Sequence, residues 1–277
     1  MLVQNHQRKV SMNDSKVFRD KIGFGDYRII QDREQFSYGI DAVLLADFAA
    51  RFINESKKCS EEIAVDLGTG TGVIPIILAH KTRLKKIVGL DIEKYFVELA
   101  KKSAVENGLD NRISYEVCDV RDCRNLNFSK IIGNCNNEMV DCNRIDCSFV
   151  LCNPPYFKAN ASIASENSIK DVARREIKGC LGDFCSFASK VLKRGGEFYL
   201  IHRPERLIDI FEALRDVSME PRDIRMVSST MSGEPKFVLV RSIKNAGENL
   251  RFMKPLAIYE NDGNYTQEIL KIYERDF

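Results

Sequence analysis

A short, mainly apolar run, Ile63–Leu67, leads directly into the glycine-rich turn Asp66–Gly72, and a second apolar run, Val73–His80, follows. The first run predicts a buried strand and the second predicts a helix. Glycines between them let the backbone turn tightly and approach a ligand closely. In an open α/β sheet, ligands bind beyond the carboxyl ends of the strands, so this turn is a candidate ligand site.

Further apolar runs alternate with amphipathic segments along the chain, which predicts an α/β fold with a parallel, doubly wound sheet. The last two predicted strands are separated by a short turn containing Gly and Pro, which favours an antiparallel hairpin. We therefore expect a mostly parallel sheet of seven strands with one reversed edge strand. The other predicted strands are Lys86–Asp91, Ile113–Cys118, Cys147–Cys152, Glu197–His202, Arg225–Ser229 and Lys236–Ser242, and the other predicted helices are Glu93–Asn107, Asp171–Leu192 and Pro204–Val217.

The chain of 277 residues is long enough for one α/β domain with a small appendage. We expect residues 1–50 to form an N-terminal extension whose helical segment packs on the core, and residues 51–277 to form the main domain. No apolar run approaches the roughly 20 residues that span a bilayer. The first 14 residues contain no apolar stretch typical of a signal peptide, so we expect a cytoplasmic protein with no membrane partner.

Charge and cysteine content indicate no special class of protein. The formal net charge of +2 does not by itself indicate nucleic-acid binding. The nine cysteines lack the paired spacing of a zinc site, so we expect free thiols and no metal. These features leave the oligomeric state open, with a monomer favoured.

Acidic residues stand where three predicted strands end. Asp66 suits the cationic amino group of S-adenosylmethionine and would repel a dinucleotide diphosphate, and the G-x-G-x-G spacing also differs from the dinucleotide fingerprint. Asp91 can accept both ribose hydroxyls, a need that NAD shares. Asp119 can accept a hydrogen bond from the adenine amino group. The residues predicted to bind the cofactor are Asp66, Gly68, Thr69, Gly70, Asp91, Ile92, Asp119, Val120 and Asn153.

The fourth predicted strand runs straight into Asn153-Pro154-Pro155-Tyr156. Proline cannot continue a central strand, so the chain must leave the sheet there. The Asn153 side-chain oxygen and the Pro154 carbonyl are two acceptors that can hold one planar amino group. Tyr156 can stack on a planar substrate, and Phe157 can form a wall of the pocket. We predict Asn153, Pro154, Pro155 and Tyr156 as the catalytic group; a rigid turn without a chemical role is the alternative interpretation.

The order of these motifs along the chain resembles that of the class I adenine-N6 and glutamine-N5 methyltransferases. The motifs are DLGTGTG, GLDIE, the strand end at Asp119 and NPPYF. The flanking segments resemble the bacterial tRNA1(Val) adenine-N6 methyltransferase family, and the resemblance covers about residues 20–275. These segments are Gln35–Ala46, Ile201–Arg206, Lys254–Tyr259 and Tyr265–Tyr273.

The resemblance implies a Rossmann-like fold, S-adenosylmethionine as cofactor, and methylation of the adenine beside the anticodon of tRNA(Val). It also makes Tyr156, Phe157 and four arginines candidates for RNA contact, although a solvated helix face would equally explain the arginines. One departure is visible, because Arg175 stands where the family commonly has histidine. The four arginines are Arg174, Arg175, Arg203 and Arg206.

Other functions remain open on the sequence alone. The same chemistry could be directed at a protein glutamine or at another RNA base amine. A binding module of the same fold without turnover and an NAD oxidoreductase are alternatives from other classes. The segment FSYGIDAVLLADF favours the tRNA interpretation over the protein one.

Overall fold

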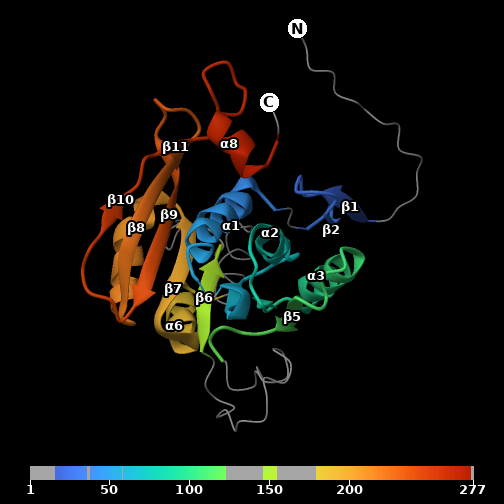
Figure 1. Cartoon of the computed structure of the whole chain (residues 1–277), viewed down its shortest axis with the longest axis horizontal. Helices are drawn as coiled ribbons and strands as arrows, with labels where there is room; N and C mark the ends of the chain where they lie inside the picture. Colours follow the sequence, from blue (N-terminus) through green and yellow to red (C-terminus); the bar gives the residue numbers. More distant parts are fainter. Residues whose placement is uncertain (1–15, 36–37, 58, 123–145, 155–178, 276–277) are drawn as a thin grey trace, which may run out of the picture.

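A single nine-stranded sheet forms the centre of the molecule in the computed structural model, which describes residues 16–35, 38–57, 59–122, 146–154 and 179–275. The strand order is β10-β8-β9-β7-β6-β3-β4-β5, and β11 also pairs with β8 (Figure 1). The strands are β3 Ile63–Leu67, β4 Lys86–Asp91, β5 Ile113–Val117, β6 Cys147–Cys152, β7 Leu192–His202, β8 Met219–Ser228, β9 Pro235–Lys244, β10 Arg251–Phe252 and β11 Leu256–Ala257.

Two layers of helices cover the sheet, because successive strand residues point to opposite faces. Ala64 of β3 packs in the core with α1 and α2, whereas its neighbour Val65 packs in the core with α6. Phe149 and Val150 of β6 divide in the same way. Helices α1 to α3 therefore lie on one face, and α6 and α7 on the other. Their bounds are α1 Ile40–Ile53, α2 Val73–Lys81, α3 Lys94–Glu106, α6 Leu181–Val191 and α7 Leu207–Arg215.

The mostly parallel sheet is confirmed, with two refinements. Strand β9 is antiparallel to both β7 and β8 and is the reversed strand of the predicted hairpin, but it lies inside the sheet, with β8 and then the short strands β10 and β11 between it and the edge. The connection from β7 through α7 places β8 two positions away from β7 in the sheet. Strand β9 then returns and fills the position between them. The sheet has nine strands instead of seven because the two-residue strands β10 and β11 both pair in parallel with β8.

Several predicted element boundaries are also different, among them the start of β8, which is Met219 instead of Arg225. Helix α6 begins at Leu181, and residues 155–178 lie outside the described part of the chain. Strand β7 begins at Leu192 instead of the predicted Glu197 and so includes Gly195 and Gly196; Gly195 has a φ of +73° and lies beside a register shift against β6. The predicted helix from Pro204 begins with a 3₁₀ turn, Pro204–Arg206, before α7.

Two short strands that the sequence did not predict precede α1. Strands β1 Val17–Lys21 and β2 Arg28–Asp32 form an antiparallel hairpin. The hairpin is attached to α3, where the Ile30 backbone N–H donates to Ser103 Oγ at 3.0 Å. Helix α1 itself is buried along most of its length in the same core as α2. We retain the division into an extension of residues 1–50 and a main domain of residues 51–277 as a proposal.

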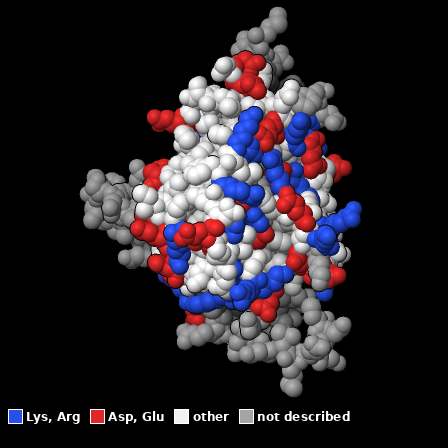
Figure 2. Space-filling model, turned by 60° about the vertical axis from the view of Figure 1, so that its left-hand side comes forward, with Lys and Arg blue, Asp and Glu red and all other residues white. Residues whose placement is uncertain are grey.

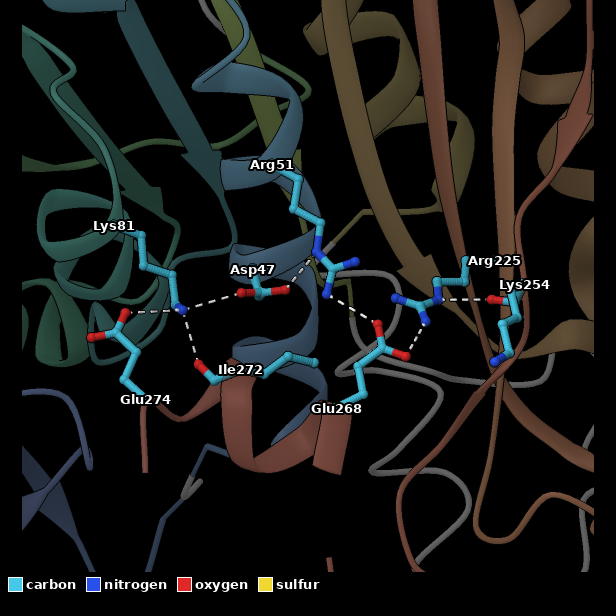
Figure 3. A network of polar contacts seen from close by, with 8 residues as sticks. All are labelled: Asp47, Arg51, Lys81, Arg225, Lys254, Glu268, Ile272 and Glu274. Carbon is cyan, nitrogen blue, oxygen red and sulfur yellow. Dashed lines mark hydrogen bonds and ion pairs between the residues drawn. The ribbon is translucent and has the colours of Figure 1, made fainter. Parts of the chain in front are cut away.

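A network of charges holds the C-terminal helix α8, Gln267–Ile272, against α1, α2 and β8 (Figure 3). Arg225 of β8 is buried and donates to Glu268 at 2.7 Å, and Glu268 also accepts from Arg51 of α1 at 3.2 Å. Lys81 of α2 pairs with Asp47 at 3.1 Å and with Glu274 at 3.2 Å. The network therefore joins the C-terminal segment to α1, to the last residue of α2 and to β8.

Candidate functional site

The residues predicted to bind the cofactor lie at, or directly after, the ends of four adjacent parallel strands. In register, Leu67 of β3 is opposite both Leu90 of β4 and Cys152 of β6, and Asp91 of β4 is opposite Val117 of β5. The carboxyl ends of β6, β3, β4 and β5 consequently form one edge of the sheet. The structure brings Gly68, Asp91, Asp119 and Asn153 to that edge, which is where an open α/β sheet binds ligands.

The glycine-rich turn is held onto strand β4 by its backbone. Gly68 and Thr69 donate their N–H groups to the Leu90 carbonyl at 2.8 and 2.9 Å. Gly68, Gly70 and Gly72 have φ values of +69°, +54° and +88°, which side chains rarely allow. A Cβ on Gly70 would meet no atom within 4 Å, whereas a Cβ on Gly72 would lie 2.5 Å from Tyr115 Oη. The turn is therefore open at Gly70 and tightly packed at Gly72.

Asp91 joins the turn to the end of β4. Its Oδ2 accepts the Gly70 N–H at 2.8 Å, and its Oδ1 accepts the Glu93 N–H at 2.9 Å. Each carboxylate oxygen has a second lone-pair direction, so this geometry still allows Asp91 to accept ligand hydroxyls. Ile92, the next residue, is half-buried beside it.

Asp66 is fully buried, and neither of its carboxylate oxygens has a hydrogen-bond partner among the described residues. The Thr69 hydroxyl beside it is buried and unpartnered in the same sense. Burial raises the pKa of Asp66 from its usual range to about 8; the neighbouring Thr69 hydroxyl acts against this rise, and the Asp91 charge adds to it. A buried carboxylate in this environment would be stabilised by a nearby cation, which is consistent with the predicted role of Asp66.

Asp119 follows β5 and is paired with Arg121 in this structure. Its Oδ1 accepts hydrogen bonds from the backbone N–H and the Nε–H of Arg121, both at 2.9 Å. Its Oδ2 accepts a further hydrogen bond from the Arg121 guanidinium at 2.7 Å. These contacts lower the pKa of Asp119 and keep it ionised at neutral pH. Val120, between the two, is buried in the core that contains α6.

Asn153 directly follows β6 and is half-buried, and Pro154 beside it is buried. The Asn153 side-chain Nδ2 donates to Asp41 Oδ2 at 3.1 Å. Asp41 lies in the first turn of α1, 112 residues earlier in the sequence. The structure thus brings the N-terminal helix to the predicted methyl-transfer residue.

Arg203 and Arg206 follow strand β7, the neighbour of β6. Arg203 lies over the Phe237 ring, with 5.2 Å between the guanidinium carbon and the ring centroid. Arg206 is paired with Asp209, so its charge is partly neutralised. His202, at the end of β7, is buried, and this burial lowers its pKa to about 4, so it is neutral at neutral pH.

Several predicted site residues lie outside the described residues. These are Pro155, Tyr156, Phe157, Arg174 and Arg175.

Sequence reasoning missed two residues of this site. Tyr115 is buried beneath the glycine-rich turn and donates its hydroxyl to the Gly72 carbonyl at 3.0 Å. An aromatic residue in the strand after Asp91 carried no signal for this contact. Asp41 lies in the segment that carries the family resemblance, but only the fold reveals its contact with Asn153.

A sequence profile described as a methyltransferase domain matches residues 58–232, more than half of the chain. The chain belongs to this methyltransferase family.

Curated relatives confirm the resemblance to the tRNA1(Val) adenine-N6 methyltransferase family that the motifs indicated. A tRNA1(Val) (adenine(37)-N6)-methyltransferase of Porphyromonas gingivalis is 26% identical over 264 residues, which cover 92% of this chain and 94% of the relative. A protein of the same name from Christiangramia forsetii is 25% identical, covering 91% and 95%.

Solved structures show the same fold. A predicted O-methyltransferase from Agrobacterium tumefaciens has a TM-score of 0.60 at 20% identity and covers 84% of this chain and 95% of its own. The 16S rRNA N2 G1207 methyltransferase of Thermus thermophilus, solved with AdoMet and guanosine, has a TM-score of 0.54 at 15% identity, covering 82% and 50%. At these identities the likeness concerns the fold alone.

The methyltransferase uses S-adenosylmethionine as its methyl donor. The residues at the sheet edge fit this cofactor, because a buried, unpartnered carboxylate at Asp66 and an open glycine at Gly70 meet there. Among the described residues, no group of three or more His, Cys, Asp or Glu residues is arranged to hold a metal ion. In the same part of the chain, no helix has the length and apolar character needed to cross a membrane.

Proposed function

We propose that this enzyme methylates the exocyclic N6 of an adenine in tRNA, with adenine 37 of tRNA(Val) as the target. The observation that carries the proposal is the curated relative whose name states this activity and which matches 92% of this chain along 94% of its own length. The relatives of the same name from other bacteria support it in the same way.

The chemistry proposed for Asn153 and Pro154 follows from the planar target. The lone pair of an exocyclic amine is delocalised into the ring, which makes the nitrogen a poor nucleophile. Two acceptors, the Asn153 side-chain oxygen and the Pro154 carbonyl, would bind its two hydrogens and favour a pyramidal nitrogen. S-adenosylmethionine, when bound, would supply the methyl group: the N–C bond would form as the S–C bond breaks, sulfur would keep the electron pair, and the proton lost from the nitrogen would pass to water. Positioning supplies most of the rate.

We propose that each of the three acids contacts a different part of the cofactor. Asp66 would bind the cationic amino group, Asp91 the ribose hydroxyls and Asp119 the adenine amino group. Gly68, Thr69 and Gly70 would provide backbone close to the cofactor, and Ile92 and Val120 would form apolar walls. The Arg121 guanidinium that pairs with Asp119 would have to share that carboxylate with the adenine.

The surface offers basic groups for an RNA partner without one uniform basic patch. Figure 2 shows many Lys and Arg side chains on the face turned forward there, with Asp and Glu side chains beside them. Arg203 follows β7 at the same sheet edge as Asn153 and is the described arginine that we propose for a phosphate contact. Arg206 is a weaker candidate because Asp209 pairs with it. Tyr156, Phe157, Arg174 and Arg175 remain proposed contacts on the basis of sequence.

A transfer assay tests this proposal. Purified enzyme and methyl-tritiated S-adenosylmethionine are incubated with a tRNA(Val) transcript, with the same transcript carrying guanine at position 37, and with a glutamine-containing release factor. We expect label in the first acceptor only. Label in both transcripts would contradict the position, and label in the protein alone would contradict the tRNA substrate and favour glutamine methylation.

A further inference from the structure

Helix α1 delivers a carboxylate to the residue that we propose for methyl transfer. Asp41 Oδ2 accepts a hydrogen bond from Asn153 Nδ2 at 3.1 Å, and both residues are half-buried. Asn153 has just left the sheet after β6, whereas Asp41 belongs to the helix that packs across the sheet. The contact is tertiary, so it depends on the docking of α1 onto the sheet.

The position of Asp41 is determined by its surroundings. It lies in the first turn of α1, where the positive end of the helix dipole stabilises a negative charge. The helix is anchored by buried residues along its length and contacts α2, β6, β7 and β9. Gly39, the residue before the helix, provides space, because a Cβ there would lie 2.5 Å from Asp41 Oδ1. A side chain at position 39 would therefore displace the carboxylate.

An ionised carboxylate can only accept hydrogen bonds, whereas a side-chain amide has one accepting end and one donating end. The Asp41 carboxylate therefore selects the rotation of the Asn153 amide that turns Nδ2 toward it. In that rotation Oδ1 is on the opposite side of the amide from Asp41. If the amide turned over, it would present N–H groups instead of an acceptor to an incoming amine.

We propose that Asp41 is a positioning residue that orients the Asn153 amide so that Oδ1 accepts from the substrate amine. This inference rests on the proposed function, since it takes Asn153 as the acceptor for that amine. It makes the N-terminal helix part of the methyl-transfer apparatus instead of a packing element alone. It applies to any planar amine substrate, whether an adenine or a glutamine amide.

The decisive test exchanges donor and acceptor. Asn153→Asp alone places two carboxylates together and leaves no donor between them. Adding Asp41→Asn restores one donor and one acceptor across the same contact, with the roles reversed. We expect single-turnover methyl transfer to fall at least 100-fold in Asn153→Asp and to recover at least tenfold in the double variant. No recovery, with both variants folded, would overturn the positioning role, because a packing role predicts no such rescue.

Single variants at position 41 give a graded result. Asp41→Ala should lower the methyl-transfer rate at least 30-fold, while the dissociation constant of S-adenosylhomocysteine changes less than threefold. Asp41→Asn should lose less, since either amide orientation then satisfies the contact and part of the population stays correct. Gly39→Ala should resemble Asp41→Ala, because it displaces the carboxylate without removing it. Equal transfer rates in wild type and Asp41→Ala would overturn the proposal.

The rate is measured on whichever acceptor the wild-type enzyme labels, so failure of tRNA as acceptor contradicts the proposed substrate and not the role of Asp41. A second measurement needs no acceptor. In the ¹⁵N-labelled full chain, the Asn153 side-chain amide signal should shift in Asp41→Ala, and the Asn153→Ala variant identifies that signal. An unchanged Asn153 signal in Asp41→Ala would overturn the proposal independently.

Discussion

Asp91 Oδ2 accepts the backbone N–H of Gly70 at 2.8 Å, so a single carboxylate connects the end of β4 to the open part of the glycine-rich turn. Asp91→Ala should therefore weaken S-adenosylhomocysteine binding by two routes, through loss of a ribose acceptor and through a loosened turn. Hydrogen bonds to charged groups contribute about 1.5–3 kcal/mol each, so we expect a loss of at least 30-fold in affinity by calorimetry. Glu116→Ala, which removes a half-buried acid of the neighbouring strand β5, serves as control. An affinity within threefold of wild type in Asp91→Ala would contradict the assignment.

Asp66 should make both stability and cofactor binding depend on pH. Its carboxyl titrates near 3.9 in an unfolded chain and at about 8 in the folded one, so folding takes up a proton between these values. The free energy of unfolding should therefore decrease as the pH rises from about 4 to 8, and Asp66→Asn should remove this contribution. Denaturant titrations of both proteins at pH 6 and pH 8 measure the difference.

Binding of the cofactor amino group near Asp66 should lower the pKa of that carboxyl again. At pH 7 the wild-type enzyme should then release a proton when it binds S-adenosylhomocysteine. Calorimetry in buffers with different ionisation enthalpies measures this release. If Asp66→Asn released the same number of protons as the wild type, Asp66 would not be the group that meets the cation.

Two glycines of the same turn should respond differently to alanine. Gly72→Ala places a Cβ 2.5 Å from Tyr115 Oη in the core, and we expect it to destabilise the fold by about 1–3 kcal/mol. Gly70→Ala has open space, so it should cost only about 1–2 kcal/mol for the left-handed backbone but reduce cofactor affinity at least tenfold. Thermal melting and calorimetry separate the two effects. A normal cofactor affinity in Gly70→Ala would show that the open side is not where the ligand lies.

The elements nearest the glycine-rich turn were the most predictable from sequence. The bounds of β3, β4 and β6 match the apolar runs, and Gly108 ends α3 with a φ of +66°, as a C-terminal glycine should. Local pattern suffices there because each strand is buried on both faces and ends at a glycine, an acid or a proline. Strand β1 was missed because none of its residues is buried. Strand β2 is buried from Ile29 to Asp32, but its last two residues are polar, so it shows no apolar run, and its Ile30 backbone bonds to α3, a contact that the sequence does not reveal.

Tertiary contacts of the site could not be predicted in the same way. The order of acids along the chain indicated Asp66, Asp91 and Asp119, but nothing in the sequence placed Arg121 on Asp119 or Tyr115 beneath Gly72. The contact between Asp41 and Asn153 spans 112 residues and depends on how α1 docks. Periodicity reports which face of an element is buried, not which polar side chains meet across two elements.

The charged cluster on β7, β8, β9 and β10 should be a determinant of stability. Asp223 is 1% exposed and accepts from Arg241 at 2.8 Å and from Arg251 at 2.7 Å, and Arg241 also pairs with Glu197 at 2.6 Å. Removing one partner of a buried pair leaves the other charge uncompensated, at a cost of about 3–5 kcal/mol.

We therefore expect Asp223→Ala to lower the free energy of unfolding by that amount in a denaturant titration. Glu34→Ala is the matched control, because Glu34 pairs with Lys16 on the surface and such pairs contribute about 0–1 kcal/mol. Equal effects of the two substitutions would contradict a stabilising role for the buried cluster.

The central claim, methylation of a tRNA adenine through Asn153, is tested most directly by nucleoside mass spectrometry of purified tRNA(Val). The tRNA is taken from a strain that lacks this gene and from the same strain complemented with wild-type or Asn153→Ala protein. We predict that N6-methyladenosine at position 37 disappears in the deletion strain, returns with the wild-type protein, and stays absent with Asn153→Ala expressed at equal level. An unchanged amount of N6-methyladenosine in the deletion strain would contradict the claim.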